Sequence, residues 1–202
     1  HTAVADAQME GKDVLEVSSG RGGGASYISR YLNPRSYVGL DLSKRSIRYC
    51  NRVYRKIPNL RFVQGDAENL PLADASVDRV VNVEASRAYP HQDRFFAEVR
   101  RVLRPDGLFC LTDMRWAEDV PRMMDLLRRA GFEVVREMRI SDNVVRALQA
   151  DNERKVQLMR SRVPKIFIRA FSEFAGMEGS ERYDSFASGR MQYLSLVLKP
   201  LK

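Results

Sequence analysis

Short apolar runs alternate with helical patterns through the first half of the chain. Runs rich in Val, Leu, Ile and Phe predict buried strands at residues 13–17, 37–40, 60–64, 77–83 and 108–112. Apolar spacing and capping signals predict helices at about 24–32, 43–56 and 93–103, and Arg-Pro-Asp-Gly at 104–107 predicts a turn. Strands that alternate with helices at this spacing indicate a parallel α/β sheet.

The pattern changes after Asp113. It predicts a helix at 120–130, a strand at 132–140, helices at 142–160 and 164–175, and a final strand at 191–198. At 202 residues the chain is most simply one domain, long enough to bury about 70% of the surface of its unfolded form. It begins at His1 without a methionine, so we expect a further segment upstream.

Composition narrows the class of protein. Hydrophobic residues make up 44% of the chain, and no stretch approaches the roughly 20 apolar residues of a membrane span. No signal peptide is visible. Cys50 and Cys110 lie far apart, and Cys110 sits in an apolar run. These features predict reduced cysteines and a cytoplasmic protein with no membrane span.

The net charge of +8 comes largely from arginines that are scattered singly or in pairs, such as Arg100 with Arg101. A nucleic-acid binder usually concentrates its basic residues on one face, with aromatic residues between them. We therefore expect solvated helix faces and no nucleic-acid partner, with an acidic partner or substrate as the alternative. Formation of a homo-oligomer stays open.

The most informative stretch is DVLEVSSGRGGGA at residues 13–25. A buried strand runs into two serines, a glycine-rich loop containing Gly20 and Gly22, and a helix start. Glycines let the backbone approach a ligand, and the helix N-terminus presents free N–H groups, so the stretch predicts a nucleotide-type pocket. A glycine loop alone is a weak signal, because this one also satisfies the permissive dinucleotide fingerprint.

Three carboxylates indicate which kind of ligand the predicted pocket binds. Glu16 lies inside the first strand, where a ligand ammonium would compensate its burial and a pyrophosphate would not; backbone N–H groups are the structural alternative. Asp41 ends the second strand, where it can accept two ribose hydroxyls or cap the next helix. Asp66 follows the third strand, where it can bind an adenine amino group or form an ordinary turn.

With these residues in place, the chain resembles the class I S-adenosylmethionine-dependent methyltransferases. The motifs are Glu16-Val-Ser-Ser-Gly20-Arg-Gly22-Gly, Asp41, Gly65-Asp66-Ala67-Glu68-Asn69-Leu70-Pro71, Val77-Asp78 and the turn at 100–107. Two stretches, Gly22-Gly-Gly-Ala-Ser-Tyr27 and Asn82-Val-Glu-Ala-Ser86, resemble the mycobacterial-type lipid O-methyltransferases of phthiotriolone, fatty acids and glycopeptidolipids. The sterol and tocopherol C-methyltransferases share a similar stretch at Glu84.

The resemblance implies a doubly wound, mostly parallel, seven-stranded Rossmann-like sheet with an antiparallel last strand and a helical insertion before it. It implies a single domain with a cofactor-binding half at 1–113 and an acceptor-side half at 114–202, whose helical cover spans about 142–188. The implied cofactor is S-adenosylmethionine, with S-adenosylhomocysteine as product. The implied cofactor-binding residues are Glu16, Ser18, Gly20, Gly22, Asp41, Leu42, Gly65, Asp66, Ala67, Asn82 and Val83.

Within this set, Glu16 and the glycine loop would hold the methionine end, Asp41 the ribose, and Asp66 with Ala67 the adenine. The backbone around 82–84 would lie near the sulfonium. Two positions depart from the family pattern: Ser18 replaces the first glycine of the usual acidic-x-Gly-x-Gly-x-Gly motif, and Arg87 stands where the lipid enzymes are expected to have histidine.

The catalytic candidates are His91 and Glu84. A hydroxyl acceptor benefits from a base, and His91 follows the fourth strand; the alternative is that His91 only starts the next helix. Glu84 is the other candidate base, or else it orients the cofactor or pairs with Arg87. His91 has no second His or Cys at ligand spacing, so no metal site is expected.

These features predict methyl transfer by in-line displacement to a hydroxyl of an apolar small molecule, a lipid or natural product. Aromatic residues at helical spacing in 164–176 favour an apolar acceptor, although such helices also simply pack on sheets. One alternative is C-methylation of an isoprenoid or prenylated compound. The others are a nicotinamide-dependent oxidoreductase, which lacks a Tyr-x-x-x-Lys pair here, and a non-catalytic cofactor-binding or RNA-binding scaffold.

Overall fold

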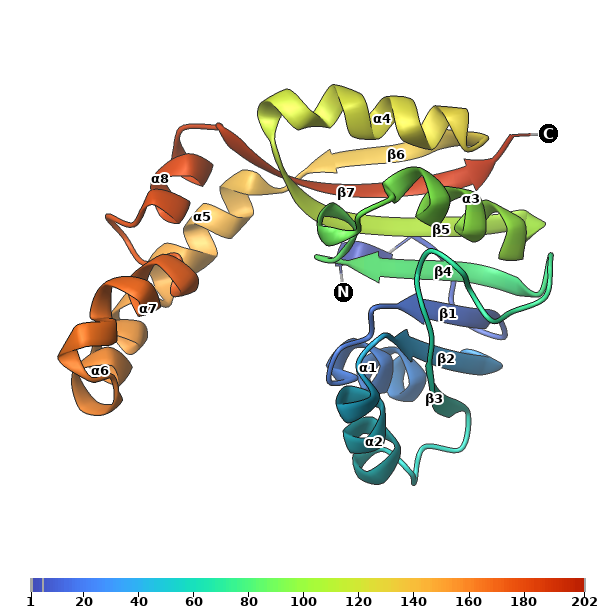
Figure 1. Cartoon of the computed structure of the whole chain (residues 1–202), viewed down its shortest axis with the longest axis horizontal. Helices are drawn as coiled ribbons and strands as arrows, with labels where there is room; N and C mark the ends of the chain where they lie inside the picture. The colour runs from blue at the N-terminus through green and yellow to red at the C-terminus, as the bar shows by residue number, and fades with distance from the viewer. Residues whose placement is uncertain (1, 5, 202) are drawn as a thin grey trace. The chain divides into compact units, whose positions relative to one another are not determined.

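The computed structural model describes residues 2–4 and 6–201. Seven strands form one sheet in the order β3-β2-β1-β4-β5-β7-β6. They are β1 (Asp13–Val17), β2 (Ser36–Asp41), β3 (Leu60–Gln64), β4 (Val77–Val83), β5 (Leu103–Trp116), β6 (Phe132–Arg139) and β7 (Met191–Pro200). The pairs β1–β2, β1–β4, β2–β3 and β4–β5 are parallel, and β7 runs antiparallel to its neighbours (Figure 1). This architecture confirms the predicted fold class.

The helices that alternate with these strands bury one apolar stripe each. They are α1 (Gly23–Tyr31), α2 (Lys44–Val53), α3 (Gln92–Val102) and α4 (Val120–Arg129), with short 3-10 turns η1 (Thr2–Val4), η2 (Ser86–Ala88) and η3 (Ala117–Asp119). In α2, Ile47 and Cys50 are buried while the surrounding charged residues are exposed. Ser43 caps α2, because its hydroxyl accepts a hydrogen bond from the Ser46 N–H at 3.2 Å.

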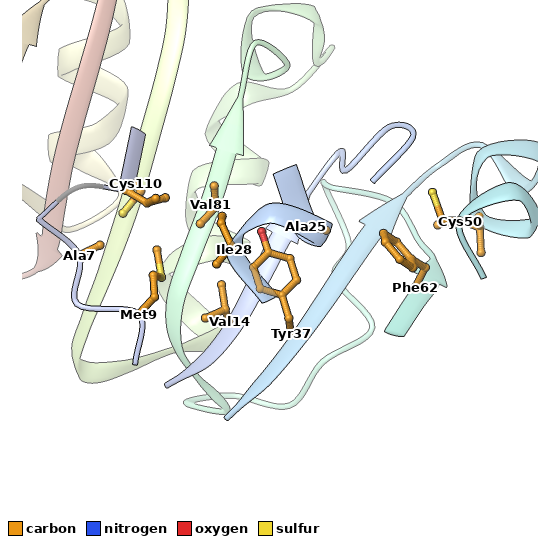
Figure 2. Packing of buried hydrophobic residues seen from close by; sticks show 12 residues of the cluster. Ala7, Met9, Val14, Ala25, Ile28, Tyr37, Cys50, Phe62, Val81 and Cys110 are labelled. Carbon is orange, nitrogen blue, oxygen red and sulfur yellow. The ribbon is translucent and has the colours of Figure 1, made fainter. Parts of the chain in front are cut away.

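The core lies on both sides of the central strands. Figure 2 shows the Tyr37 ring of β2 among Val14, Ile28 and Val81, all of them buried. On β5, the fully buried Phe109 ring packs against two phenylalanine rings of α3, with centroids 6.0 and 6.3 Å away. Each such side chain contributes about 1.5–3 kcal/mol through removal from water, so the packing of α3 is a major part of the fold's stability.

The chain packs into two compact units. The first contains residues up to Asp113, Pro121–Met138 and Ser195 onward; the second contains Met114–Val120 and Arg139–Leu194. The second unit consists mainly of α5 (Ser141–Ala150), α6 (Asn152–Arg162), η4 (Lys165–Phe167), α7 (Ile168–Ala175) and α8 (Glu181–Ala187). Its own core gathers Met114, Phe186 and Met191 against partly buried residues of α5. None of the helices among the described residues is long and apolar enough to cross a membrane.

Two expectations about the helical insertion are wrong. The helix predicted at 142–160 is two helices, α5 and α6, which meet at Asp151. The Asp151 carboxylate stands at the N-terminus of α6 and accepts hydrogen bonds from Arg154, a position where the helix dipole favours a negative charge. The helix predicted to open at Pro164 begins at Ile168, after η4, and ends at Gly176 as expected.

Two further segments differ in detail from the sequence prediction. The turn at 104–107 lies inside β5, where the register advances two residues on β4 and five on β5, so the turn is a bulge in a continuous strand. The apolar pattern does not predict α8 as a separate element. Its start is marked by Ser180, whose hydroxyl accepts a hydrogen bond from the Tyr183 N–H.

Candidate active site

The loop between β1 and α1 turns through three residues with left-handed backbone. Ser18, Gly20 and Gly22 have φ values of 61°, 55° and 74°. Glycine is required at position 22, because a Cβ there would lie 2.7 Å from the Phe62 ring and 2.8 Å from the Tyr54 ring. Ser18 accepts a backbone strain of about 1 kcal/mol that glycine would avoid. Backbone strain is therefore the physical reason why the family pattern has glycine at the position of Ser18.

Ser18 has a compensating contact. Its hydroxyl lies 2.6 Å from the hydroxyl oxygen of Tyr89, which follows β4 and η2. The Tyr89 hydroxyl also accepts a hydrogen bond from the side-chain amide of Asn82 at 2.9 Å. The serine that departs from the family pattern therefore ties the glycine loop to the segment after β4.

Glu16 is a buried carboxylate on β1 with only 7% of its surface exposed. The Tyr37 hydroxyl donates a hydrogen bond to Oε2 of Glu16 at 3.0 Å. Oε1 of Glu16 lies close to Gly24, because a Cβ added at Gly24 would be 2.9 Å from this oxygen. No basic side chain of the described residues pairs with it. Burial raises the pKa of Glu16 to about 7, against the opposing effect of the Tyr37 hydrogen bond. A ligand cation would reverse that shift.

Asp41 links two loops at the end of β2. Its Oδ2 accepts a hydrogen bond from the Gly20 N–H and its Oδ1 from the Ser43 N–H, both at 2.8 Å. Since each carboxylate oxygen has two lone pairs, both can still accept from a ligand hydroxyl. Leu42, the next residue, is 70% exposed. The side chain that caps α2 is Ser43, so Asp41 is not needed as its N-cap.

The loop after β3 lies beside the end of β2. The Gly65 N–H donates to the Asp41 carbonyl at 3.2 Å, and a Cβ at Gly65 would lie 2.7 Å from Leu40. Asp66 is exposed, and its Oδ1 accepts a hydrogen bond from the Glu68 N–H at 2.9 Å, which is the ordinary turn that the sequence allows as an alternative. Ala67 is buried.

At the end of β4, Asn82 is completely buried. Its side-chain amide donates to the Val17 carbonyl at 3.0 Å as well as to Tyr89, whereas its Oδ1 has no hydrogen-bond partner among the described residues. An unpaired buried acceptor costs about 1–3 kcal/mol. Asn82 therefore presents an acceptor beside the glycine loop that a ligand donor could satisfy, and the neighbouring Val83 is 37% exposed.

The segment after β4 carries both catalytic candidates. Glu84 is exposed, has a left-handed backbone with φ of 53°, and its N–H donates to the Thr112 carbonyl at 2.8 Å. The buried Asp113 holds the following residues, because its Oδ2 accepts from the Ser86 hydroxyl at 2.9 Å and from the Arg87 N–H at 3.1 Å. These hydrogen bonds hold the segment that follows Glu84 and so help to fix the position of Glu84 at the end of β4.

His91 is exposed at the N-cap position of α3, and its backbone N–H donates to Glu68 at 2.8 Å. It lines a hollow of about 530 Å³ together with Arg122 and Arg129 of α4. The helix-start interpretation of His91 thus has direct structural support. Across the described residues, no group of three or more His, Cys, Asp or Glu side chains is arranged to hold a metal ion.

The structure brings most of the predicted cofactor residues to one place, the carboxyl ends of β1, β2, β3 and β4, called here the carboxyl edge. Tyr37 and Tyr89 also contact residues at this edge, and the sequence motifs do not predict either of them. Tyr37 was detectable in principle, because a tyrosine in a buried strand next to a buried carboxylate needs a hydrogen-bond partner. Tyr89 carried no such signal, since its contact with Ser18 spans 71 residues of sequence.

Comparison with known proteins identifies relatives of this arrangement. A family model described as "Methyltransferase domain" matches residues 15–111. The phthiotriol/phenolphthiotriol dimycocerosates methyltransferase of Mycobacterium tuberculosis (strain ATCC 25177 / H37Ra) is 40% identical over 193 residues, which cover 96% of this chain and 71% of that protein.

Two further similarities extend the comparison. The fatty-acid O-methyltransferase of Mycolicibacterium smegmatis is 46% identical over 149 residues, which cover 74% of this chain and 54% of that protein. Among solved structures, a putative sarcosine dimethylglycine methyltransferase from Galdieria sulphuraria superimposes with a TM-score of 0.83 at 16% identity, covering 98% of this chain and 82% of the other. The last similarity concerns the fold alone.

Proposed function

The chain belongs to the class I S-adenosylmethionine-dependent methyltransferases, and we propose that it methylates a hydroxyl group of an apolar small molecule, a lipid or a related natural product. The observation that carries the cofactor part is the gathering of Glu16, Asp41 and Asn82 at the carboxyl edge. The acceptor part is supported by the relatives named for phthiotriol dimycocerosates and for fatty acids.

The residues of the carboxyl edge fit S-adenosylmethionine group by group. Glu16 is a buried carboxylate without a cationic partner and Asn82 has a free buried acceptor, so together they suit the donor's ammonium group. Asp41 suits the ribose diol because both its oxygens keep free lone pairs. Asp66 and Ala67 would meet the adenine, the exposed side chain of Leu42 would cover one of its faces, and Val83 would lie near the sulfonium.

S-adenosylmethionine supplies an electrophilic methyl group on a sulfonium, so the protein's own task is alignment and exclusion of water. In the proposal, the Asp113 contacts hold the segment after β4 in place, and Glu84 or His91 takes the acceptor proton. Phe167 and Phe174 of the second unit are 56% and 77% exposed. Exposed aromatic side chains suit contact with an apolar molecule, which supports an apolar acceptor.

Product analysis tests the proposal. The full chain is incubated with deuterated-methyl S-adenosylmethionine and, in parallel, a long-chain fatty acid, a long-chain secondary alcohol, a prenylated phenol and glycine. We expect a methyl ester or ether on a long-chain acceptor, detected by mass spectrometry, because the relatives are named for phthiotriol dimycocerosates and for fatty acids. A new C–CH₃ bond would contradict the hydroxyl assignment, and a preference for glycine would contradict the apolar acceptor.

Substitution of the catalytic candidates is a separate test. We expect His91→Ala to lower kcat at least about tenfold if His91 is the base, since positioned general bases contribute about 10²–10⁴-fold. Glu84→Gln removes the other candidate with little change in shape. Affinity for S-adenosylhomocysteine serves as the fold control for both variants. If both retain kcat with saturating acceptor, alignment alone accounts for the rate and the base is dropped from the proposal.

A further inference from the structure

Three arginines of α2 and one of the glycine loop line one part of the surface without a carboxylate partner among the described residues. Elsewhere, some arginines pair with a carboxylate within 4 Å, among them Arg35, Arg101, Arg104, Arg128, Arg129, Arg136 and Arg154. Arg45, Arg48 and Arg52 are exposed and have no carboxylate partner in the part of the chain that the structure describes. The same is true of Arg21 in the glycine loop. These four charges are not neutralised within the protein.

The four side chains line one surface hollow of about 1010 Å³, together with Ser46 and Tyr49, called here the arginine hollow. Arg45, Arg48 and Arg52 are three and four residues apart, so they share one face of α2. Arg21 reaches the same hollow from the glycine loop, with its guanidinium carbon 4.5 Å from the centroid of the Tyr49 ring. Like charges at this spacing destabilise a helix, so the cluster does not serve the fold.

An anionic ligand would offset this repulsion, and guanidinium groups match phosphate in geometry because they donate two parallel hydrogen bonds. An exposed apolar side chain, Val53, closes α2 and is 46% exposed. Basic residues beside exposed apolar ones are typical of surfaces that dock on anionic bilayers. A single-strand nucleic-acid site would instead offer free aromatic faces, and here one face of the Tyr49 ring is covered by the Arg21 guanidinium.

We propose that the arginine hollow docks this protein on an anionic phospholipid surface, with lipid phosphates against Arg21, Arg45, Arg48 and Arg52. Arg21 directly follows Gly20, whose N–H donates to Asp41, so the docking surface borders the carboxyl edge. An apolar acceptor partitions into a bilayer, and docking there brings the enzyme to it. The docking proposal goes beyond the proposed function and does not depend on which group is methylated.

Cosedimentation of the full chain with vesicles tests the docking. One set of vesicles contains phosphatidylglycerol and phosphatidylcholine, and the other contains phosphatidylcholine alone. We expect binding to the first set only, weakened by salt, and a loss of about 100-fold in the variant Arg45→Gln/Arg48→Gln/Arg52→Gln. The control Arg128→Gln/Arg129→Gln/Arg154→Gln removes the same charge from paired arginines and is expected to bind within about threefold of the original chain.

Equal losses in the two triple variants would overturn the proposal, because binding would then follow net charge alone. Unchanged binding in the α2 variant would also overturn it. Displacement of the protein from vesicles by inorganic phosphate would point instead to a site for a soluble anion, and tight binding of single-stranded RNA without vesicle binding would point to nucleic acid. Affinity for S-adenosylhomocysteine confirms folding, and methyl transfer to a detergent-dispersed acceptor is measured separately, so docking and the proposed function can fail independently.

Discussion

Replacing Glu16 by glutamine is expected to weaken S-adenosylhomocysteine binding by about 100-fold or more, because removing one partner of a buried ion pair costs about 3–5 kcal/mol. The same variant is expected to make the ligand-free protein more stable at pH 8. Glutamine keeps an acceptor for the Tyr37 hydroxyl but carries no charge to bury. Loss of binding together with gain of stability is the signature of a residue kept for a ligand.

The direction of the stability effect follows from the pKa. The folded pKa of Glu16 is about 7 and its ordinary value is 4.5. The carboxyl group therefore favours folding when protonated, and its contribution is fully present below pH 4.5 and lost as pH rises through 7. The free energy of unfolding is therefore expected to be about 1–3 kcal/mol smaller at pH 8 than at pH 5. Arg35 lowers the pKa of Asp13 well below its usual range, so the stability contributed by Asp13 is lost only as pH falls below about 4, outside this window.

Urea unfolding at pH 5 and pH 8, with calorimetry of S-adenosylhomocysteine binding, measures both effects. The original chain should be less stable at pH 8, and Glu16→Gln should remove most of that difference. Glu10→Gln is the matched control, since Glu10 is exposed, and it should change neither quantity. Retained affinity in Glu16→Gln would remove Glu16 from the cofactor site, whatever its effect on stability.

Replacing Asp41 by alanine is expected to weaken S-adenosylhomocysteine binding by about 100-fold, because hydrogen bonds to a charged group contribute about 1.5–3 kcal/mol each. The variant loses the ribose acceptor and also leaves the N–H groups of Gly20 and Ser43 without their partner. Asp106→Ala, which removes an exposed aspartate from the β5 bulge, is the control and should bind normally.

A ligand analogue separates the two contributions of Asp41. The original chain should bind the 2′-deoxy analogue of S-adenosylhomocysteine more weakly than the ribose form, whereas Asp41→Ala should not distinguish the two ligands. Calorimetry of the four combinations measures this coupling. If the variant still prefers the ribose form to the same extent as the original chain, the diol is bound elsewhere and Asp41 only supports the loops.

The sequence by itself determined the order of strands and helices and the residue types at the carboxyl edge. Apolar runs bounded by glycine, proline and acidic residues predict the strands, and the positions of Glu16, Asp41 and Asn82 on those strands mark them as site residues. Such residues can be recognised from the chain alone because parallel strands end at the same edge of a sheet, so residues at successive strand ends meet whatever the loops do.

Tertiary structure alone decided which side chains pair across long separations. Tyr37 donates a hydrogen bond to Glu16, Tyr89 contacts Ser18, and Asp113 accepts a hydrogen bond from Ser86. Among the described residues, Arg45, Arg48 and Arg52 of α2 have no carboxylate partner. Such pairings depend on strand register and on the packing of whole elements, which residue spacing along the chain does not encode. Local patterns therefore predict where a ligand is bound, and only the folded chain shows which groups remain free to bind it.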